Sequence, residues 1–213
     1  MLESVLCEQD EEEKKSREGK KMHKYLELNQ FGKALQLELV PTYYLENRTL
    51  AIQLEDEEGP YCDLTRCLDD APGRNRAYVD VNNMGPDIVQ CLEEGGFGKA
   101  TGKTFQSGYV TYPEFEFDAD ILKANRNEYY QQYLEWQDQL KDDEVYLSGS
   151  CVQCHKTFTF IVKRSAAQKY REYQKGGPYL IQDVFPEMTN GERGLFARGQ
   201  NMCNECFKKL FHL

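Results

Sequence analysis

Four of the eight cysteines fall in two Cys-x-x-Cys pairs, and this spacing is typical of metal ligands. Two intervening residues let both sulfur atoms of a pair reach one ion, and a tetrahedral ion needs two such pairs. The sequence therefore predicts a zinc ion bound by Cys151, Cys154, Cys203 and Cys206. Because four protein ligands leave no coordination position open, this zinc would be structural and would stabilise a module of about 65 residues.

Other chemistries of the same cysteines remain open. Because His155 follows Cys154, the first pair also matches a c-type haem attachment signal, which requires an exported protein. A redox dithiol of the thioredoxin type would need a βαβ unit, which the sequence pattern does not predict. We expect His155 to face solvent. The remaining cysteines, which we expect to be free thiols in a reducing compartment, are Cys7, Cys62, Cys67 and Cys91.

The elements expected around the cysteines favour a treble-clef-like zinc module over residues 145–213. A strand is expected at 157–162, directly after the first pair, and a final helix at 206–213 would carry ligands in its first turn. The positive end of that helix would stabilise the thiolates. Two further helices are expected near Ser165 and Thr189, each followed three residues later by Gln or Glu, as in a capping box.

Residues 22–124 contain stretches in which apolar and polar side chains alternate, which predicts an antiparallel sheet in an α+β domain. Strands are expected at 33–40, 49–54, 61–68, 77–81 and through Phe115 and Phe117. A short helix is expected between Pro86 and Gly95, because proline favours the first turn of a helix and glycine its end. The Gly- and Thr-rich residues 97–112 are expected to form a loop.

Residues 125–144 are expected to form a helix that links the two domains. Tyr129, Tyr133, Trp136 and Leu140 lie on one stripe of this helix. The stripe either packs against the sheet or the zinc module, or presents aromatic anchors to a partner, since Tyr and Trp are favoured at interfaces. Tyr129, Tyr133 and Trp136 are therefore candidate partner-binding residues.

The net charge of −10 is distributed unevenly along the chain. Residues 22–144 carry 24 acidic and 11 basic side chains, whereas residues 145–213 carry 5 acidic and 10 basic ones. This separation either serves solubility alone or indicates partners. An acidic domain would offer a phosphate-like surface to a nucleic-acid-binding protein. Basic residues that would bind nucleic acid directly cluster around one expected helix, and they are Lys163, Arg164, Lys169, Arg171 and Lys175.

The N-terminal residues and the apolar content bear on compartment. Residues 1–21 are rich in Glu and Lys, and we expect them to form a disordered charged tail. No stretch reaches the roughly 18 apolar residues of a membrane span, and no signal peptide is recognisable. We therefore expect a cytoplasmic protein that does not bind membranes.

Catalytic motifs find little support. Gly102, Lys103 and Thr104 resemble the end of a phosphate-binding loop, but Phe97 stands where its first glycine is required. No Ser-His-Asp set and no distinct carboxylate pair can be identified. We therefore expect no enzyme and no small-molecule substrate; the alternative is a catalytic site in the glycine-rich loop near residues 82–83.

Two stretches of the chain resemble known families. The sequences LAIQL, YCDLT, YVDVNN and SGYVTYP within residues 48–122 resemble a domain-of-unknown-function family carried by phages, plasmids and conjugative elements of gut bacteria. Residues 151–211, with CVQC, IQDVFP and CNECF, are similar to small zinc-ribbon-like proteins of the same elements.

Together with the acidic domain, the resemblance implies a non-catalytic accessory protein of a mobile element, acting in the cytoplasm of the bacterial host. Its partner would be a host macromolecule, and the first hypothesis is a defence nuclease inhibited in the anti-CRISPR or anti-restriction manner. The alternative is a nucleic-acid-binding regulator that acts through the basic zinc module.

Overall fold

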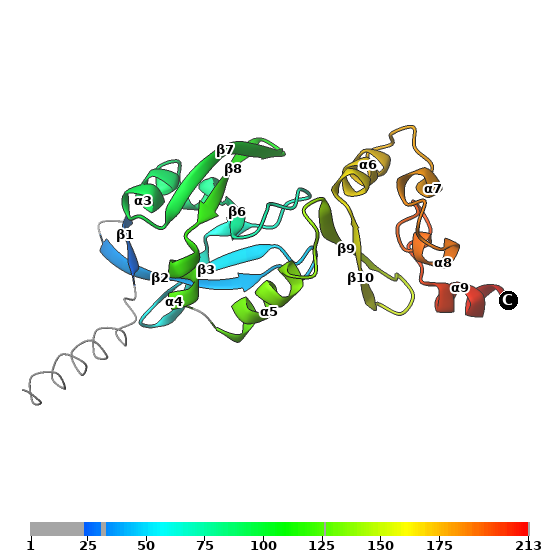
Figure 1. The fold of residues 1–213 in the computed structure, drawn as a ribbon, viewed down its shortest axis with the longest axis horizontal. Helices are drawn as coiled ribbons and strands as arrows, with labels where there is room; N and C mark the ends of the chain where they lie inside the picture. Colours follow the sequence, from blue (N-terminus) through cyan, green and yellow to red (C-terminus); the bar gives the residue numbers. More distant parts are fainter. Residues whose placement is uncertain (1–23, 31–32, 126, 213) are drawn as a thin grey trace, which may run out of the picture.

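The computed structural model describes residues 24–30, 33–125 and 127–212 of the chain. The predicted disordered tail and Cys7 lie outside the described residues. The architecture is mixed α+β with antiparallel sheets, which confirms the predicted fold class. In Figure 1 the sheets and helices of the N-terminal domain lie at one end of the long axis, and the C-terminal module lies at the other.

The first sheet has the strand order β1 (Tyr25–Gln30), β2 (Lys33–Tyr43), β3 (Leu50–Asp56) and β4 (Gly59–Asp63). Each strand pairs antiparallel with the next one along the chain. Alternation fixes the register, because Leu37 and Leu39 on β2 and Ile52 and Leu54 on β3 are buried on one face. The strands predicted over 33–40 and 49–54 are confirmed. The strand predicted over 61–68 is divided between β4 and a short strand of the second sheet, β5 (Thr65–Arg66).

The second sheet has the strand order β5 (Thr65–Arg66), β6 (Arg76–Val79), β8 (Val110–Phe117) and β7 (Gly98–Ser107). β7 lies where the sequence predicts a loop, so that prediction is wrong. No residue of this edge strand is fully buried, and therefore no apolar alternation marks it. Glycine is required at its start, because a Cβ on Gly98 would lie 2.1 Å from the carbonyl oxygen of Glu116.

The helices of the N-terminal domain are α2 (Val81–Met84), α3 (Ile88–Glu94), α4 (Ala119–Ala124) and α5 (Glu128–Gln137). α3 confirms the helix predicted in this segment. The linking helix predicted over 125–144 is wrong in extent. Asn127 caps α5 by accepting a hydrogen bond from the Tyr130 N–H, and the helix already ends at Gln137. The acidic residues that follow are unfavourable at the negative end of a helix.

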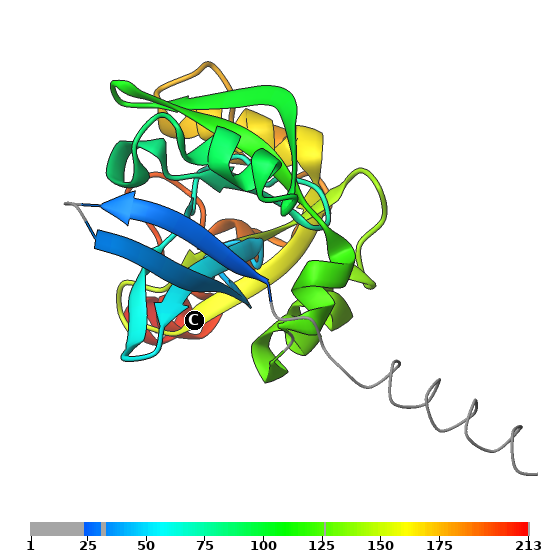
Figure 2. The same cartoon turned by 90° about the vertical axis from the view of Figure 1, so that its left-hand side faces the viewer.

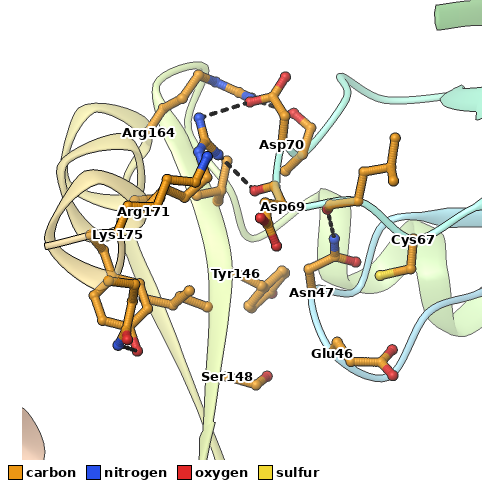
Figure 3. Close-up of a pocket in the computed structure, with 17 residues that line it drawn as sticks. Glu46, Asn47, Cys67, Asp69, Asp70, Tyr146, Ser148, Arg164, Arg171 and Lys175 are labelled. Atoms are coloured by element: carbon orange, nitrogen blue, oxygen red, sulfur yellow. Dashed lines mark hydrogen bonds and ion pairs between the residues drawn. The ribbon is translucent and has the colours of Figure 1, made fainter. Parts of the chain in front are cut away.

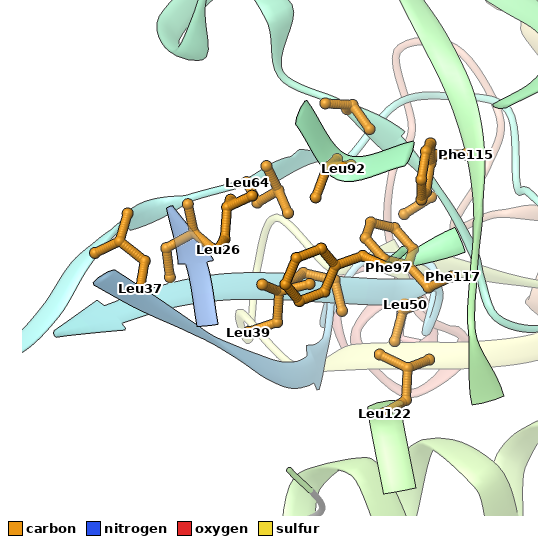
Figure 4. Packing of buried hydrophobic residues seen from close by; sticks show 14 of the residues in the cluster. Leu26, Leu37, Leu39, Leu50, Leu64, Leu92, Phe97, Phe115, Phe117 and Leu122 are labelled. Carbon is orange, nitrogen blue, oxygen red and sulfur yellow. The ribbon is translucent and has the colours of Figure 1, made fainter. Parts of the chain in front are cut away.

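The core of this domain lies between the two sheets and the helices beside them. In Figure 2 the blue-to-cyan strands of the first sheet lie below the green β7–β8 hairpin. Figure 4 shows Leu39 of the first sheet close to Phe97, with Phe115 and Phe117 of β8 nearby. The rings of Phe115 and Phe117 are 4.9 Å apart, and both side chains are buried. This packing holds the two sheets together as one body.

The C-terminal module contains β9 (Glu144–Ser150), β10 (Thr157–Lys163), α6 (Arg164–Gln174), α7 (Ile181–Val184), α8 (Asn190–Arg193) and α9 (Asn204–Phe211). β10 and α9 confirm the predicted strand and final helix, whereas β9 is not predicted. The capping box at Thr189 is present, but Ser165 caps no helix because α6 begins one residue before it. A second core surrounds Phe185 and Phe196.

Within the described residues, none of the helices combines the length and the apolar character that a membrane crossing requires.

Candidate metal centre

The four predicted ligands come from two places that are distant in sequence. Cys151 and Cys154 lie in the turn between β9 and β10, and the Cys151 N–H donates to the Lys156 carbonyl across this turn at 3.0 Å. Cys203 directly precedes α9, and Cys206 lies in its first turn. The knuckle and the helix are thereby brought together at the end of the module.

The sulfur atoms of Cys151, Cys154, Cys203 and Cys206 all lie within 4.8 Å of one another. The Sγ atoms of Cys154 and Cys203 are 3.9 Å apart. A tetrahedral ion with metal–sulfur bonds of about 2.3 Å would place its sulfurs about 3.8 Å apart. Every cysteine within the described residues is a free thiol, so no disulfide joins these pairs. The four side chains could therefore bind one metal ion.

The electrostatics of the cluster favour a cation at its centre. The Cys203 N–H donates to the Cys151 sulfur at 3.3 Å, and this hydrogen bond lowers the pKa of Cys151 to about 6. The neighbouring sulfurs, first that of Cys203, raise the pKa of Cys206 to about 12. Four thiolates in so small a volume repel one another, and a divalent ion would offset that repulsion.

Backbone contacts fix the position of the two ligand pairs. The Val152 N–H donates to the Asn201 carbonyl at 2.9 Å, which joins the knuckle to the segment before α9. α8 approaches α9 closely, since a Cβ on Gly191 would lie 2.7 Å from Asn204. His155 adopts a left-handed conformation with φ 59° and is exposed, as the sequence predicts. Its backbone turns the knuckle while its side chain points to solvent.

Two arginines of the predicted basic cluster on α6 face the N-terminal domain. Arg164 donates to the carbonyl of Ala71, and Arg171 donates to the carbonyl of Asp69 at 2.6 Å. Arg171 also contacts a carboxylate oxygen of Asp70 at 3.3 Å. Figure 3 shows both arginines reaching from α6 to this loop across a cavity of about 650 Å³. The two arginines therefore hold the two parts of the chain together.

The three lysines of the cluster differ in their ion pairing and exposure. Lys163 forms ion pairs with Asp143 at 2.9 Å and with Glu144 at 3.4 Å. Its hydrogen bond to Asp143 raises the pKa of Lys163 and lowers that of Asp143. Lys169 and Lys175 are exposed. The cluster is thus not one free cationic face.

The residues of the aromatic stripe predicted on the linking helix differ in their burial. Tyr133 is buried, and its hydroxyl oxygen accepts the Asn75 N–H at 2.9 Å, so its assignment to a partner-binding surface is wrong. Trp136 is half-buried, packing 4.4 Å from the Tyr43 ring and 3.7 Å from the Arg48 guanidinium. Tyr129 is half-exposed. The sequence pattern shows the stripe but not which neighbours cover it.

The groups around the interdomain cavity are engaged in structural contacts. The Tyr146 hydroxyl donates to the Trp136 carbonyl at 3.0 Å, and the Tyr78 hydroxyl donates to Asp70 at 2.8 Å. Burial raises the pKa of the Cys67 thiol to about 11, so this thiol is protonated at neutral pH. These contacts were not predicted, because they join residues distant in sequence.

Comparison with known proteins identifies one segment of the chain. Residues 36–140 match the model of a family described as Domain of unknown function (DUF4313). The match extends from β2 to just beyond α5 and therefore excludes the cysteine cluster. No curated protein matches the chain, and no solved structure does.

Proposed function

We propose that this chain is a non-catalytic binding protein whose acidic N-terminal domain docks on a basic partner. The observation that supports it most is the face of the first sheet that points away from the core. Glu27, Glu38, Glu55 and Asp63 alternate with buried neighbours and therefore share this face.

The register places Glu38 directly opposite Glu55 across β2 and β3. Glu27 and Asp63, which are exposed, extend this row of carboxylates over β1 and β4. A basic partner surface would be attracted to these carboxylates over a distance of about one Debye length. The acidic face is thus suited to binding a basic surface.

The partner in this proposal is a host protein that normally binds nucleic acid. An array of carboxylates competes for the cationic groups with which such a protein contacts phosphates. The resemblance to families of phages and other mobile elements suggests an accessory protein of such an element, and a defence nuclease is the first candidate partner. The chain would then act as an inhibitor by occupying the nuclease surface.

Two features favour binding over catalysis. Arg164, Arg171 and Tyr146, which line the interdomain cavity, already donate hydrogen bonds to groups of the chain itself. Cys67, the cavity's thiol, has a raised pKa of about 11 and is a poor nucleophile at neutral pH. Direct nucleic-acid binding through α6 has less support than the acidic face, because Lys163, Arg164 and Arg171 are engaged in internal contacts.

For the cysteine cluster we propose zinc in a structural, treble-clef-like site. A set of four sulfur ligands suits zinc or iron, and zinc is the usual ion of small structural modules. A knuckle between β9 and β10 and a second pair at the start of α9 are the parts that such a site needs. The metal then holds the module together and takes no part in chemistry.

Affinity capture with matched charge variants tests the binding proposal. One variant carries Glu27→Gln, Glu55→Gln and Asp63→Asn on the acidic face. The control carries three equivalent neutralisations on exposed acids of the helices α3, α4 and α5, at Glu94, Asp120 and Glu135. Both variants change the net charge by the same amount.

Wild type and control should retain the same host nucleic-acid-binding protein, and the face variant should lose it. Raising the salt concentration should weaken this complex, because exposed charges are screened. Equal capture by the face variant and the control would contradict the proposal, and so would the absence of any specific partner.

A further inference from the structure

A groove runs along β10 in the C-terminal module. Two adjoining hollows of about 430 Å³ and 390 Å³ share Phe160 and Glu192 among their lining residues. One wall is formed by Lys156, Phe158 and residues 160–163, and residues of α6 between 165 and 169 adjoin it. The opposite wall is formed by residues 183–192 and the start of α9. In Figure 1, α7 and α8 lie beside the β9–β10 hairpin. We call this feature the β10 groove.

The strand that forms one wall has a free backbone edge. Within the described residues, β10 pairs with β9 alone. At the two ends of this hairpin, Cys151 N–H donates to Lys156 and Arg164 N–H donates to Asp143. Hydrogen-bonded positions alternate along an antiparallel pair, so the even-numbered residues of β10 bond to β9.

The odd-numbered residues, Thr157, Thr159 and Ile161, therefore direct their N–H and C=O groups away from β9. The close contact of 2.9 Å between the side-chain oxygens of Thr159 and Ser148 agrees with this assignment, because non-hydrogen-bonded pairs lie closer. An open row of donors and acceptors of this kind is a template for a further strand.

The surface beside this edge is partly apolar. Phe158 and Phe160 are half-buried, and Ile161 is 44% exposed. Val184 and Met188 contribute apolar surface from the opposite wall. An added strand would find room for side chains that alternate along its length, as strand addition requires.

Charge separates the two walls of the groove. Residues 145–213 contain five acidic side chains, and four of these line the groove, namely Asp183, Glu187, Glu192 and Glu205. Asp183 and Glu192 also accept hydrogen bonds from helix-start N–H groups, whereas Glu187 and Glu205 are exposed. Lys156, Lys163 and Lys169 also line the groove, but none of them belongs to residues 183–192 or to the start of α9. The wall opposite β10 is therefore acidic within a module of positive net charge.

We infer that the β10 groove binds an extended peptide segment of a partner protein, which adds to β10 as a further strand. Its apolar side chains would alternate along the groove, and Lys or Arg would face the acidic wall. β10 has seven residues, so the segment would span about 23 Å. This site goes beyond the proposed function, because it lies on the other part of the chain and does not depend on the acidic sheet.

A fluorescein-labelled peptide of four Lys-Val repeats tests the inference on the full chain, with a peptide of four Glu-Val repeats as the charge control. The Lys-Val probe should bind, as measured by fluorescence anisotropy, and the Glu-Val probe should bind at least about fivefold more weakly. Amide signals of residues 157–163 and 183–192 should shift in ¹H–¹⁵N spectra. Equal binding of the two probes, or no binding of either, would overturn the inference.

Two variants locate the site. Thr159→Pro removes one outward N–H without removing a bond to β9, and it should weaken binding by about fivefold or more. Glu187→Lys should weaken peptide binding about two- to fivefold. Glu172→Lys should leave it unchanged, because Glu172 is the acidic residue of 145–213 that does not line the groove. Unaltered binding by both groove variants would contradict the inference.

Sedimentation of the unliganded chain separates a peptide from a second copy as the occupant. The wild type should not form a dimer through the free edge of β10. A dimer that Thr159→Pro abolishes would show that β10 pairs with another copy of the chain, and the peptide site would then be rejected.

Discussion

Replacing Cys203 by serine should remove the metal ion and unfold the C-terminal module while the N-terminal domain stays folded. Cys203 is buried, it precedes α9, and its N–H contacts the Cys151 sulfur. Serine is close to cysteine in size but does not supply a soft thiolate ligand. The substitution therefore removes one ligand with little change in packing volume.

The expected size of the effect follows from the module's small core. Ten buried residues form this core, and modules below about 70 residues rarely gain more than about 3–5 kcal/mol from such a cluster. A structural zinc ion contributes about 10–16 kcal/mol of apparent binding free energy. The free energy lost with the ion is thus larger than the free energy that the module's core can supply. The N-terminal core shares no buried residue with it, so it should remain intact.

Metal analysis and ¹H–¹⁵N spectra of the full chain measure the two effects separately. Cys62→Ser is the matched control, since Cys62 is half-buried beside Met84 and belongs to the other core. Wild type and control should hold one zinc ion per chain, whereas Cys203→Ser should hold none and lose signal dispersion over 145–212. A Cys203→Ser protein that kept its zinc, or kept a folded module without it, would refute the reasoning.

Three further changes test other parts of the structure. Tyr133→Phe leaves the Asn75 N–H without its acceptor and should lower the free energy of unfolding by about 1–3 kcal/mol in urea titrations; no change would show that water replaces the hydroxyl. Arg171→Ala should increase the motion between the two parts, seen as a larger radius of gyration in X-ray scattering, whereas the exposed Lys169→Ala should not. The pKa of Cys67 is raised from 9.0 to about 11. The stabilisation from this neutral thiol is therefore present below pH 9 and is lost as the pH rises through about 11, because the unfolded state releases the proton first. Cys67→Ser should reduce this alkaline loss of stability, and an unchanged pH profile would contradict the shift.

Local patterns were sufficient to predict the cluster of four cysteines and much of the first sheet. A Cys-x-x-Cys pair constrains its two sulfurs through a short turn, and alternation in β2 and β3 reflects burial on one face. β7 was not predicted because it is an exposed edge strand. Its polar side chains do not alternate with buried apolar ones, so the sequence lacks the pattern that marks a strand. α5 was predicted too long, because the aromatic stripe continues past the residue at which the helix ends.

The role of the basic residues on α6 could not be predicted from the sequence. Arg164 and Arg171 contact residues 69–71, about a hundred positions earlier, and no periodicity reports such a pairing. A cationic helix face has the same pattern whether its charges meet solvent, nucleic acid or another part of the chain. Only the long-range packing distinguishes these cases.

The same packing links the two proposed binding surfaces. Arg164, Ala167, Arg171 and Gln174 follow one another at helical spacing and all line the cavity against the N-terminal domain. The contacts of Arg164 and Arg171 thus limit the motion of the acidic sheet relative to the β10 groove. A partner that contacts both would gain from the high effective concentration of the second site once the first is bound.

Arg171→Ala tests whether the effective concentration of the second surface contributes to affinity, apart from the contacts that each surface makes with the partner. The substituted residue lies in neither surface, so binding of the Lys-Val peptide to the groove should not change. Binding of a partner that spans both surfaces should weaken, since the looser joint lowers the effective concentration of the second site. Equal affinity of wild type and Arg171→Ala for the whole partner would mean that only one surface is used at a time. The contacts of α6 would then serve stability alone, and the two surfaces would have to be explained by separate partners.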